Sequence, residues 1–167
     1  NKVYGELENI SVSEQSMRYA YPDILKKGIS EKHQLNFHSP YGCSKGSADQ
    51  YVRDYFRMYD IPTVVFRQSC IYGPRQMGME DQGWVAHFAI RTCLGKPLNI
   101  YGTGKQVRDL LDVSDLISAY QKAVDKIKIA GGKIYNIGGG LTHSFSLLEY
   151  IEFLQLLTGK KITARFE

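Results

Sequence analysis

Tyr41 and Lys45 stand four positions apart in a segment that follows directly after a serine and a proline. Residues four apart on a helix lie one above the other, so the phenol and the ammonium would share a small volume. A free tyrosine has a pKa of about 10, and its use as a base at about pH 7 requires about 4 kcal/mol in favour of the phenolate. A neighbouring ammonium supplies part of that energy. The pair is therefore a candidate general base with its activating partner.

The spacing alone is a weak signal for chemistry. The same spacing recurs at Tyr101 and Lys105, where the glycine turn YGTGK lies between the two residues. A turn does not align two side chains as a helix does, so this second match has no chemical meaning. Two ordinary surface side chains remain the alternative for Tyr41 and Lys45, and the surrounding elements must decide between the two interpretations.

A helix around the first pair is well supported by its start signals and its periodicity. Ser39 stands where an N-cap is expected and Pro40 at the first helical position, where the missing amide hydrogen costs nothing. The pattern predicts a helix that ends near Asp60. Its apolar and aromatic stripe, with three- and four-residue steps, comprises Tyr41, Lys45, Ala48, Val52, Tyr55, Phe56 and Tyr59.

Short apolar strands and amphipathic helices alternate after this helix, which predicts an α/β fold. The segment IPTVVFRQS is typical of a strand buried in a parallel sheet, so a βαβ unit is expected. Residues 5–36 lack periodicity and predict a long loop with one helical turn. The other predicted elements are a helix at 82–94 closed by Gly95, strands at 98–101, 108–113, 133–137 and 161–166, a helix capped by Ser114, and a helix that starts at the capping box of Ser146 and Glu149 and ends at Gly159.

Composition excludes several classes of protein. The 167 residues match one domain, and no apolar run approaches the roughly 20 residues of a membrane-spanning helix. The net charge of +4 is scattered, which argues against nucleic-acid binding. Cys43, Cys70 and Cys93 form no C-x-x-C pair and the four histidines show no ligand spacing, so no metal is expected. Reduced thiols predict a cytoplasmic protein.

Five ordered blocks carry a resemblance to a known family: NKVYG, SPYGCSK on the capped helix, VVFRQSCIYGPRQ, YGTGKQVRDLLDVSDL and YNIGGG. Their order resembles the extended short-chain dehydrogenase/reductase superfamily, the NAD-dependent sugar-nucleotide epimerases and dehydratases. Within it, NKVYG, RQSCIYGPRQMGMEDQGWVA and GTGKQVRDLLDV are most similar to the branch of CDP-tyvelose (CDP-paratose) 2-epimerases. The resemblance covers nearly the whole chain.

The resemblance implies the C-terminal part of a Rossmann-like parallel sheet together with a smaller nucleotide-sugar-binding region. Residues 1–75 would form the second half of the Rossmann-like domain with the Tyr41 helix. Residues 76–167 would form mainly the sugar-nucleotide region, with strand 133–137 returning to the Rossmann sheet. The family's catalytic serine or threonine and its glycine-rich dinucleotide turn would precede Asn1, so the chain is expected to be the C-terminal half of an enzyme and inactive by itself.

The resemblance also implies roles for individual residues. Tyr41 would be the base, Lys45 its partner and a ligand of the nicotinamide ribose, and Ser69 would approach the nicotinamide of NAD. For Cys70, a small buried hydrophobe is the alternative to a substrate contact. For Arg108, a salt bridge to a neighbouring aspartate is the alternative to a diphosphate contact. The implied substrate-binding set is Cys70, Asn99, Ile100, Tyr101, Gln106, Arg108 and Asn136.

The reaction expected from this resemblance is epimerisation at C2 of a CDP-linked 3,6-dideoxyhexose, by transient oxidation to a keto-sugar and re-reduction. Dehydratases need a carboxylate pair where this chain has Asn1 and Lys2, so dehydration is disfavoured. A UDP-sugar 4-epimerase remains an alternative. A non-catalytic nucleotide-sugar-binding module and a structural oligomerisation domain are alternatives from other classes. Relatives pack such helices into dimers, so a homo-oligomer is expected.

Overall fold

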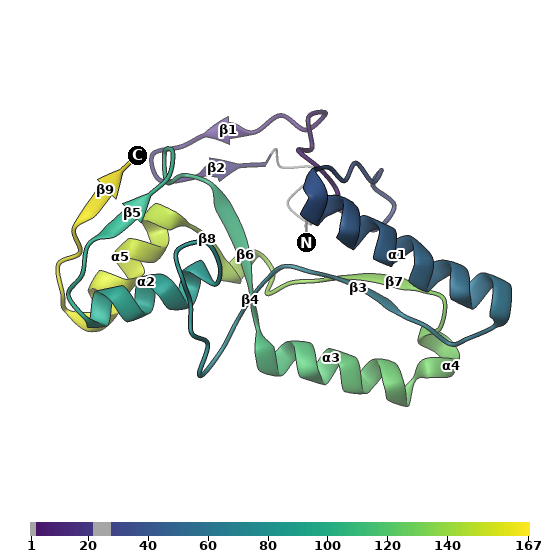
Figure 1. Cartoon of the computed structure of the whole chain (residues 1–167). Helices are drawn as coiled ribbons and strands as arrows, with labels where there is room; N and C mark the ends of the chain where they lie inside the picture. The colour runs from purple at the N-terminus through teal and green to yellow at the C-terminus, as the bar shows by residue number, and fades with distance from the viewer. Residues whose placement is uncertain (1–2, 22–27) are drawn as a thin grey trace.

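The computed structural model describes residues 3–21 and 28–167 (Figure 1). The expectation that rests on Asn1 and Lys2 falls outside the described residues. The chain is an α/β protein in which two packed regions lie along one elongated body (Figure 1). The expected fold class is confirmed, and the two regions position different groups of candidate residues.

The first region is a layered α/β/α arrangement around two parallel strands. Strand β3 (Val65–Gln68) pairs in parallel with β7 (Ile134–Ile137). Helix α1 (Ser39–Tyr59) covers one face of this pair and α3 (Val113–Asp125) covers the other (Figure 1). Because side chains alternate along a strand, Val65 and Arg67 lie toward α1, whereas Phe66 contacts Tyr120 of α3 at 5.3 Å between ring centroids.

The second region holds the main hydrophobic core. Strand β6 (Val107–Asp112) lies between β4 (Cys70–Tyr72), which is parallel to it, and β8 (Ser144–Ser146), which is antiparallel. The parallel pair β5 (Leu98–Ile100) and β9 (Ala164–Phe166) lies beside them with helices α2 (Trp84–Cys93) and α5 (Leu147–Thr158). The buried cluster consists of Val85, Phe88, Leu98, Ile100, Leu110, Tyr150, Ile151 and Leu154.

The predicted loop at 5–36 contains a feature that its sequence did not reveal. Strands β1 (Ser13–Glu14) and β2 (Tyr19–Ala20) form a short antiparallel hairpin, and no helical turn occurs in residues 5–21 or 28–36. The remaining short elements are α4 (Ile127–Ala130) and the 3-10 turn η2 (Leu141–His143). Strands β1, β2, β4 and β8 are too short to show a period by themselves and were not predicted, whereas the equally short β5 and β9 lie within longer runs at 98–101 and 161–166 that were predicted as strands.

Two predicted helix caps differ from the observed ones. Helix α1 begins at Ser39, with His38 in the cap position, although Ser39 Oγ still accepts a hydrogen bond from the Gly42 amide at 3.2 Å. Helix α3 is capped by Asp112 rather than Ser114, because the Asp112 carboxylate accepts from both the amide and the hydroxyl of Ser114, at 2.8 and 2.5 Å. A carboxylate two residues upstream thus takes the role expected of the serine.

The predicted capping box of α5 is confirmed. Ser146 Oγ accepts from the Glu149 amide at 3.0 Å, and Glu149 Oε2 accepts from the Ser146 amide at 2.8 Å. Ser146 is fully buried. We expect Ser146→Ala to lower the free energy of unfolding by about 1–2 kcal/mol, because the amide of Glu149 then loses its acceptor in a dry environment. Urea denaturation measures the loss, and an unchanged midpoint would contradict it.

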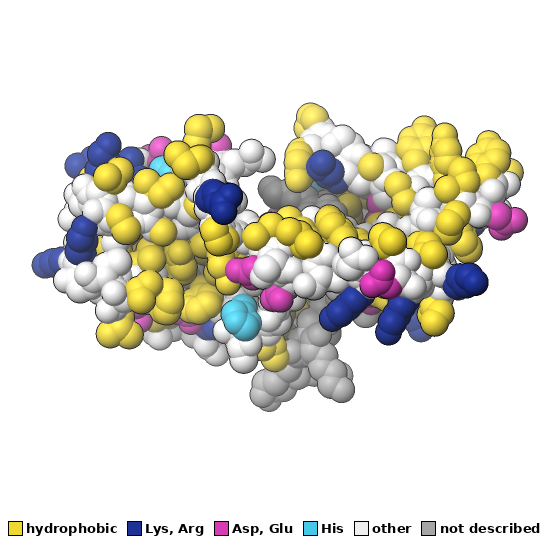
Figure 2. Space-filling model, turned by 90° about the horizontal axis from the view of Figure 1, so that it is seen from below, with side chains coloured by type: hydrophobic (Ala, Val, Ile, Leu, Met, Phe, Trp, Pro, Cys, Tyr) yellow, Lys and Arg dark blue, Asp and Glu magenta, His cyan; other side chains and the backbone are white. Residues whose placement is uncertain are grey.

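The apolar face predicted for α3 is only partly buried. Leu116 is buried, whereas Ile117 and Val124 expose 60% and 66% of their surface. Apolar side chains accordingly gather over α3 on the face seen in Figure 2. Within residues 3–21 and 28–167, no helix has both the length and the apolar character needed to cross a membrane.

Candidate functional site

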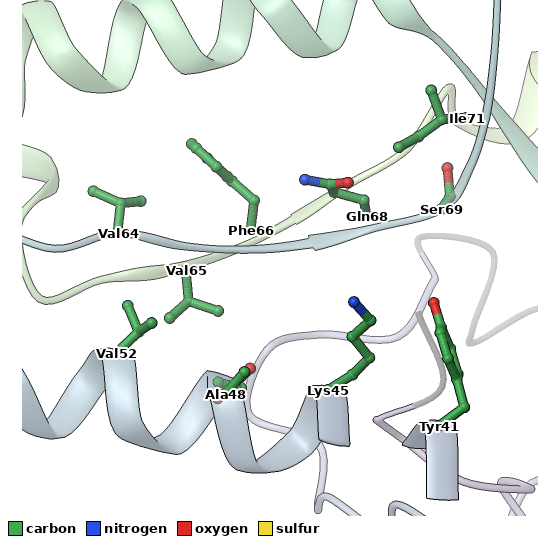
Figure 3. Close-up of a pocket in the computed structure, with 11 residues that line it drawn as sticks. Tyr41, Lys45, Ala48, Val52, Val64, Val65, Phe66, Gln68, Ser69 and Ile71 are labelled. Carbon is green, nitrogen blue, oxygen red and sulfur yellow. The ribbon is translucent and has the colours of Figure 1, made fainter. Parts of the chain in front are cut away.

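Tyr41 and Lys45 line one pocket between α1 and β3. The two side chains project from the first turns of α1 toward the end of β3, where Gln68 and Ser69 lie (Figure 3). The ammonium of Lys45 lies 5.5 Å from the centroid of the Tyr41 ring. The pocket has a volume of about 380 Å³. The helical alignment expected from the four-residue spacing is therefore present, and both polar groups open into the same space.

Ser69 also lines this pocket, although its hydroxyl points away from Tyr41 and Lys45 (Figure 3). Its Oγ atom is buried and forms no hydrogen bond within the described residues. Buried hydroxyls are nearly always paired in folded proteins, and one that is left over at a cavity wall is available to a polar ligand. Among the described residues no carboxylate pairs with Lys45 either. The pocket thus offers a phenol and an ammonium side by side, which suits the ribose hydroxyls of a nicotinamide nucleotide, and Ser69 lies in its wall.

A buried ion pair lies directly behind the Tyr41–Lys45 pair. Asp49, one helical turn after Lys45, also lines the pocket, and its carboxylate accepts from Arg67 Nε at 2.7 Å and from a terminal nitrogen at 3.2 Å. The side chains of Arg67 and Asp49 are only 2% and 3% exposed. Burial works to lower the pKa of Arg67, but the hydrogen bonds that Arg67 donates to Asp49 and Tyr4, together with the charge of Asp49, outweigh it and raise that pKa. The fork-shaped pair fixes α1 against β3.

The ion pair continues into a network that reaches β7. Arg67 donates to the hydroxyl of Tyr4 at 2.8 Å, and that hydroxyl donates to Asn136 Oδ1 at 2.7 Å. The side-chain nitrogen of Asn136, Nδ2, donates to the carbonyl of Ile29 at 2.7 Å. The backbone amide of Asn136 donates to Glu31 Oε1, also at 2.7 Å. The Asn136 amide hydrogen bond lowers the pKa of Glu31. Asn136 is therefore paired with the N-terminal segment in this structure and lies apart from the other candidate substrate residues.

A second pocket gathers four of the candidate substrate residues. Asn99 and Tyr101 come from β5 and its end, whereas Gln106 and Arg108 come from the turn after it and from β6. This pocket has a volume of about 170 Å³, and we call it the β5–β6 pocket. Its other lining residues are Glu80, Trp84, Phe88 and Leu147. Arg108 forms no ion pair within the described residues, so the alternative of a salt bridge to Asp109 or Asp112 is not realised there.

Two further candidate substrate residues, like Asn136, lie outside both pockets. The side chain of Ile100 is fully buried in the core and cannot contact a ligand. Its backbone carbonyl accepts from the Glu167 amide at 3.0 Å. Cys70 is half-buried on β4 and packs against the same core. That position matches the alternative of a small hydrophobe for Cys70. The sequence pattern does not distinguish a core residue from a binding residue within a three-residue strand.

Glu80 was not predicted from the sequence, although it lines the β5–β6 pocket. Its Oε1 atom accepts from Asn99 Nδ2 at 2.8 Å and from the Tyr101 hydroxyl at 3.2 Å. The Asn99 hydrogen bond is the main cause that lowers the pKa of Glu80, and the Glu80 charge in turn raises the pKa of Tyr101. Glu80 stands in an irregular segment before α2. It lies within the block RQSCIYGPRQMGMEDQGWVA that carries the resemblance, but no periodicity in that segment distinguishes its side chain as a binding group.

Comparison with known proteins shows which family the chain resembles. Residues 16–138 match the model of the NAD dependent epimerase/dehydratase family. The chain is 48% identical over 160 residues to the CDP-paratose 2-epimerase of Salmonella typhi. This match covers 93% of this chain and 47% of that relative. It is 41% identical over 139 residues to the dTDP-glucose 4,6-dehydratase of Salmonella typhimurium, across 83% of this chain and 35% of the relative.

Solved structures give the same result. The dTDP-glucose 4,6-dehydratase of Bacillus anthracis, in complex with NAD, superposes with a TM-score of 0.74 at 30% identity, over 99% of this chain and 47% of that chain. The UDP-glucuronic acid 4-epimerase of Bacillus cereus, in complex with UDP-glucuronic acid and NAD, gives a TM-score of 0.73 at 32% identity, over 83% of this chain and 42% of that chain. The chain thus spans less than half the length of these relatives. It belongs to the NAD-dependent epimerase/dehydratase family.

Proposed function

We propose that the chain carries the catalytic tyrosine–lysine pair and the nucleotide-sugar pocket of an NAD-dependent sugar-nucleotide epimerase. One observation supports this most strongly: Tyr41 and Lys45 from α1 and Ser69 from the end of β3 line one pocket of about 380 Å³. Because the chain spans less than half of its relatives, the activity is proposed for the complete protein that contains it.

The residues of the chain divide the chemistry among them. Tyr41 would take the proton from a sugar hydroxyl through its phenolate oxygen, and Lys45 would stabilise that phenolate through its charge. Lys45 and Ser69 would hold the ribose and the nicotinamide of the cofactor. When bound, NAD would supply the oxidation of the sugar carbon and the reduction that follows. Inversion then needs only that the keto-sugar turn its other face toward Tyr41 before the proton is given back.

The substrate we propose is a CDP-linked 3,6-dideoxyhexose that is inverted at C2. The 48% identity with the CDP-paratose 2-epimerase supports this choice over other nucleotide sugars. Arg108 is the residue we assign to the diphosphate, because its guanidinium has no ion pair among residues 3–21 and 28–167 and can present its donors to phosphate oxygens. Asn99, Tyr101 and Gln106 would surround the nucleoside in the same pocket.

The division of labour within the chain and its assembly are also proposals. Residues 1–75 would belong with the cofactor-binding region and residues 76–167 mainly with the nucleotide-sugar region, and the parallel pairing of β7 with β3 supports the return of strand 133–137. The exposed aromatic residues Tyr51, Tyr55 and Tyr59 on α1 support a homo-oligomer. Three unpaired cysteines are in keeping with a cytoplasmic location.

The test is a product analysis with the complete protein, NAD and a CDP-3,6-dideoxyhexose deuterated at C2. We expect nuclear magnetic resonance to show the C2 epimer with the label retained, because the hydrogen would leave and return within the site. Inversion at C4 of a UDP-sugar, or loss of water from the sugar, would contradict the proposed reaction. Binding of CDP without any turnover would instead indicate a non-catalytic module.

A further inference from the structure

The β5–β6 pocket contains an acidic group as well as a basic one. Arg108 and Glu80 both line it, and the aromatic side chains of Trp84, Phe88 and Tyr101 form much of the remaining wall. A guanidinium is complementary to phosphate oxygens, whereas a carboxylate repels them. A nucleotide that enters this pocket must therefore place something other than phosphate against Glu80.

The carboxylate of Glu80 is held in a fixed orientation. Its Oε1 atom accepts from both Asn99 Nδ2 and the Tyr101 hydroxyl, at 2.8 and 3.2 Å. Its Oε2 atom has no donor among residues 3–21 and 28–167. One oxygen is thus anchored by two neighbours that also line the pocket, and the other is left to accept a hydrogen bond from a ligand.

An ionised carboxylate can only accept hydrogen bonds, so its ligand must donate one. Among the pyrimidine bases, cytosine presents an amine at C4, whereas uracil and thymine present a carbonyl oxygen at that position. The C4 carbonyl of uracil or thymine would face the Glu80 carboxylate, which is also an acceptor, and would lose its hydrogen bonds to water without gaining a new one. A pocket of about 170 Å³ is small among ligand sites and has aromatic walls, which favours a single planar ring.

The indole of Trp84 adds a donor to the same wall. Its Nε1 atom is buried and has no acceptor within the described residues. Cytosine carries a carbonyl at C2 that could accept such a hydrogen bond. All three pyrimidine bases carry this C2 carbonyl, so the choice of cytosine rests on the carboxylate of Glu80, which needs the amine at C4.

We propose that Glu80 is a specificity-determining residue that selects a cytidine nucleotide over a uridine or thymidine nucleotide by accepting a hydrogen bond from the C4 amine of the base. This inference rests on the proposed function, since it assumes that the β5–β6 pocket receives the nucleotide of the sugar substrate. Asn99 and Tyr101 act as positioning residues, because they orient the carboxylate.

Isothermal titration of the 167-residue chain with CDP, UDP, dTDP and ADP tests the proposal. We expect CDP to bind at least about tenfold more tightly than UDP or dTDP, a factor typical of one base-specific hydrogen bond. In Glu80→Gln the preference should fall to about twofold or less, because the amide can donate to the uracil carbonyl as well as accept. Glu152→Gln, which removes the same charge from an exposed position on α5, should keep the wild-type preference.

The outcomes separate this inference from the proposed function. A Glu80→Gln chain that keeps the wild-type preference for CDP would overturn the role of Glu80 and leave the epimerase proposal intact. Equal binding of all four nucleotides by the wild type, or no binding of any, would also overturn it. A tenfold preference that depends on Glu80, in a complete protein that fails to epimerise any CDP-sugar, would support the inference and contradict the proposed function.

Discussion

Tyr41→Phe is expected to lower kcat of the complete protein by about 10³-fold, within the range of general acid–base catalysis. The phenylalanine keeps the ring that lies beside Lys45 but removes the oxygen that would take the proton. Because the ring still fills its side of the pocket, we expect KM for the CDP-sugar to change less than about threefold. A loss confined to kcat is what separates a proton-transfer role from a structural one. Steady-state kinetics with the CDP-sugar measures both constants.

Tyr51→Phe is the matched control for this substitution. Tyr51 lies on the same helix, is 69% exposed and lines neither pocket, so loss of its hydroxyl should leave kcat unchanged. The two variants share the same chemical change in the same helix. Near wild-type turnover in Tyr41→Phe would contradict the assignment of the base, whatever the control does. A fall in both variants would point to damage to α1.

The sequence predicted those parts of the site that depend on local structure. A helix is determined by residues close in the chain, so the cap signals and the stripe from Tyr41 onward were enough to align Tyr41 with Lys45. Ser69 follows a strand that could be predicted from its apolar run, which put it at the edge of the pair β3–β7. The capping box of Ser146 and Glu149 is local as well, and it was predicted correctly.

The parts that were missed depend on contacts between distant segments. Arg67 is a charged residue in a four-residue strand, and its partner Asp49 lies on the same helical stripe as Lys45. Both facts were available in the sequence, but the pairing of Arg67 with Asp49 becomes visible only when α1 is packed on β3. Glu80 likewise gains its meaning from Asn99 and Tyr101, which follow it by about twenty residues. The assignment of Ile100 to the substrate set did not anticipate that its side chain fills the core.

Asp49→Asn is expected to lower the free energy of unfolding by about 3–5 kcal/mol, the usual cost of breaking a buried ion pair. Asparagine has the same shape as aspartate, so the loss reports charge rather than a cavity. The Arg67 side chain, 2% exposed, would retain hydrogen bonds to Tyr4 and to the Glu31 carbonyl but would lose the carboxylate of its ion pair. Urea denaturation of the 167-residue chain measures the change.

Two further variants decide whether the effect comes from an uncompensated charge. Asp54→Asn removes the same charge from an exposed position on α1, and we expect a change of less than about 0.5 kcal/mol. The double substitution Asp49→Leu with Arg67→Met removes both charges and should cost less than Asp49→Asn alone, because no buried ion is left unpaired. If Asp49→Asn stays within about 1 kcal/mol of the wild type, the pair does not fix α1 against β3. Tyr41 and Lys45 would then owe their place in the pocket to packing of the apolar stripe of α1 alone.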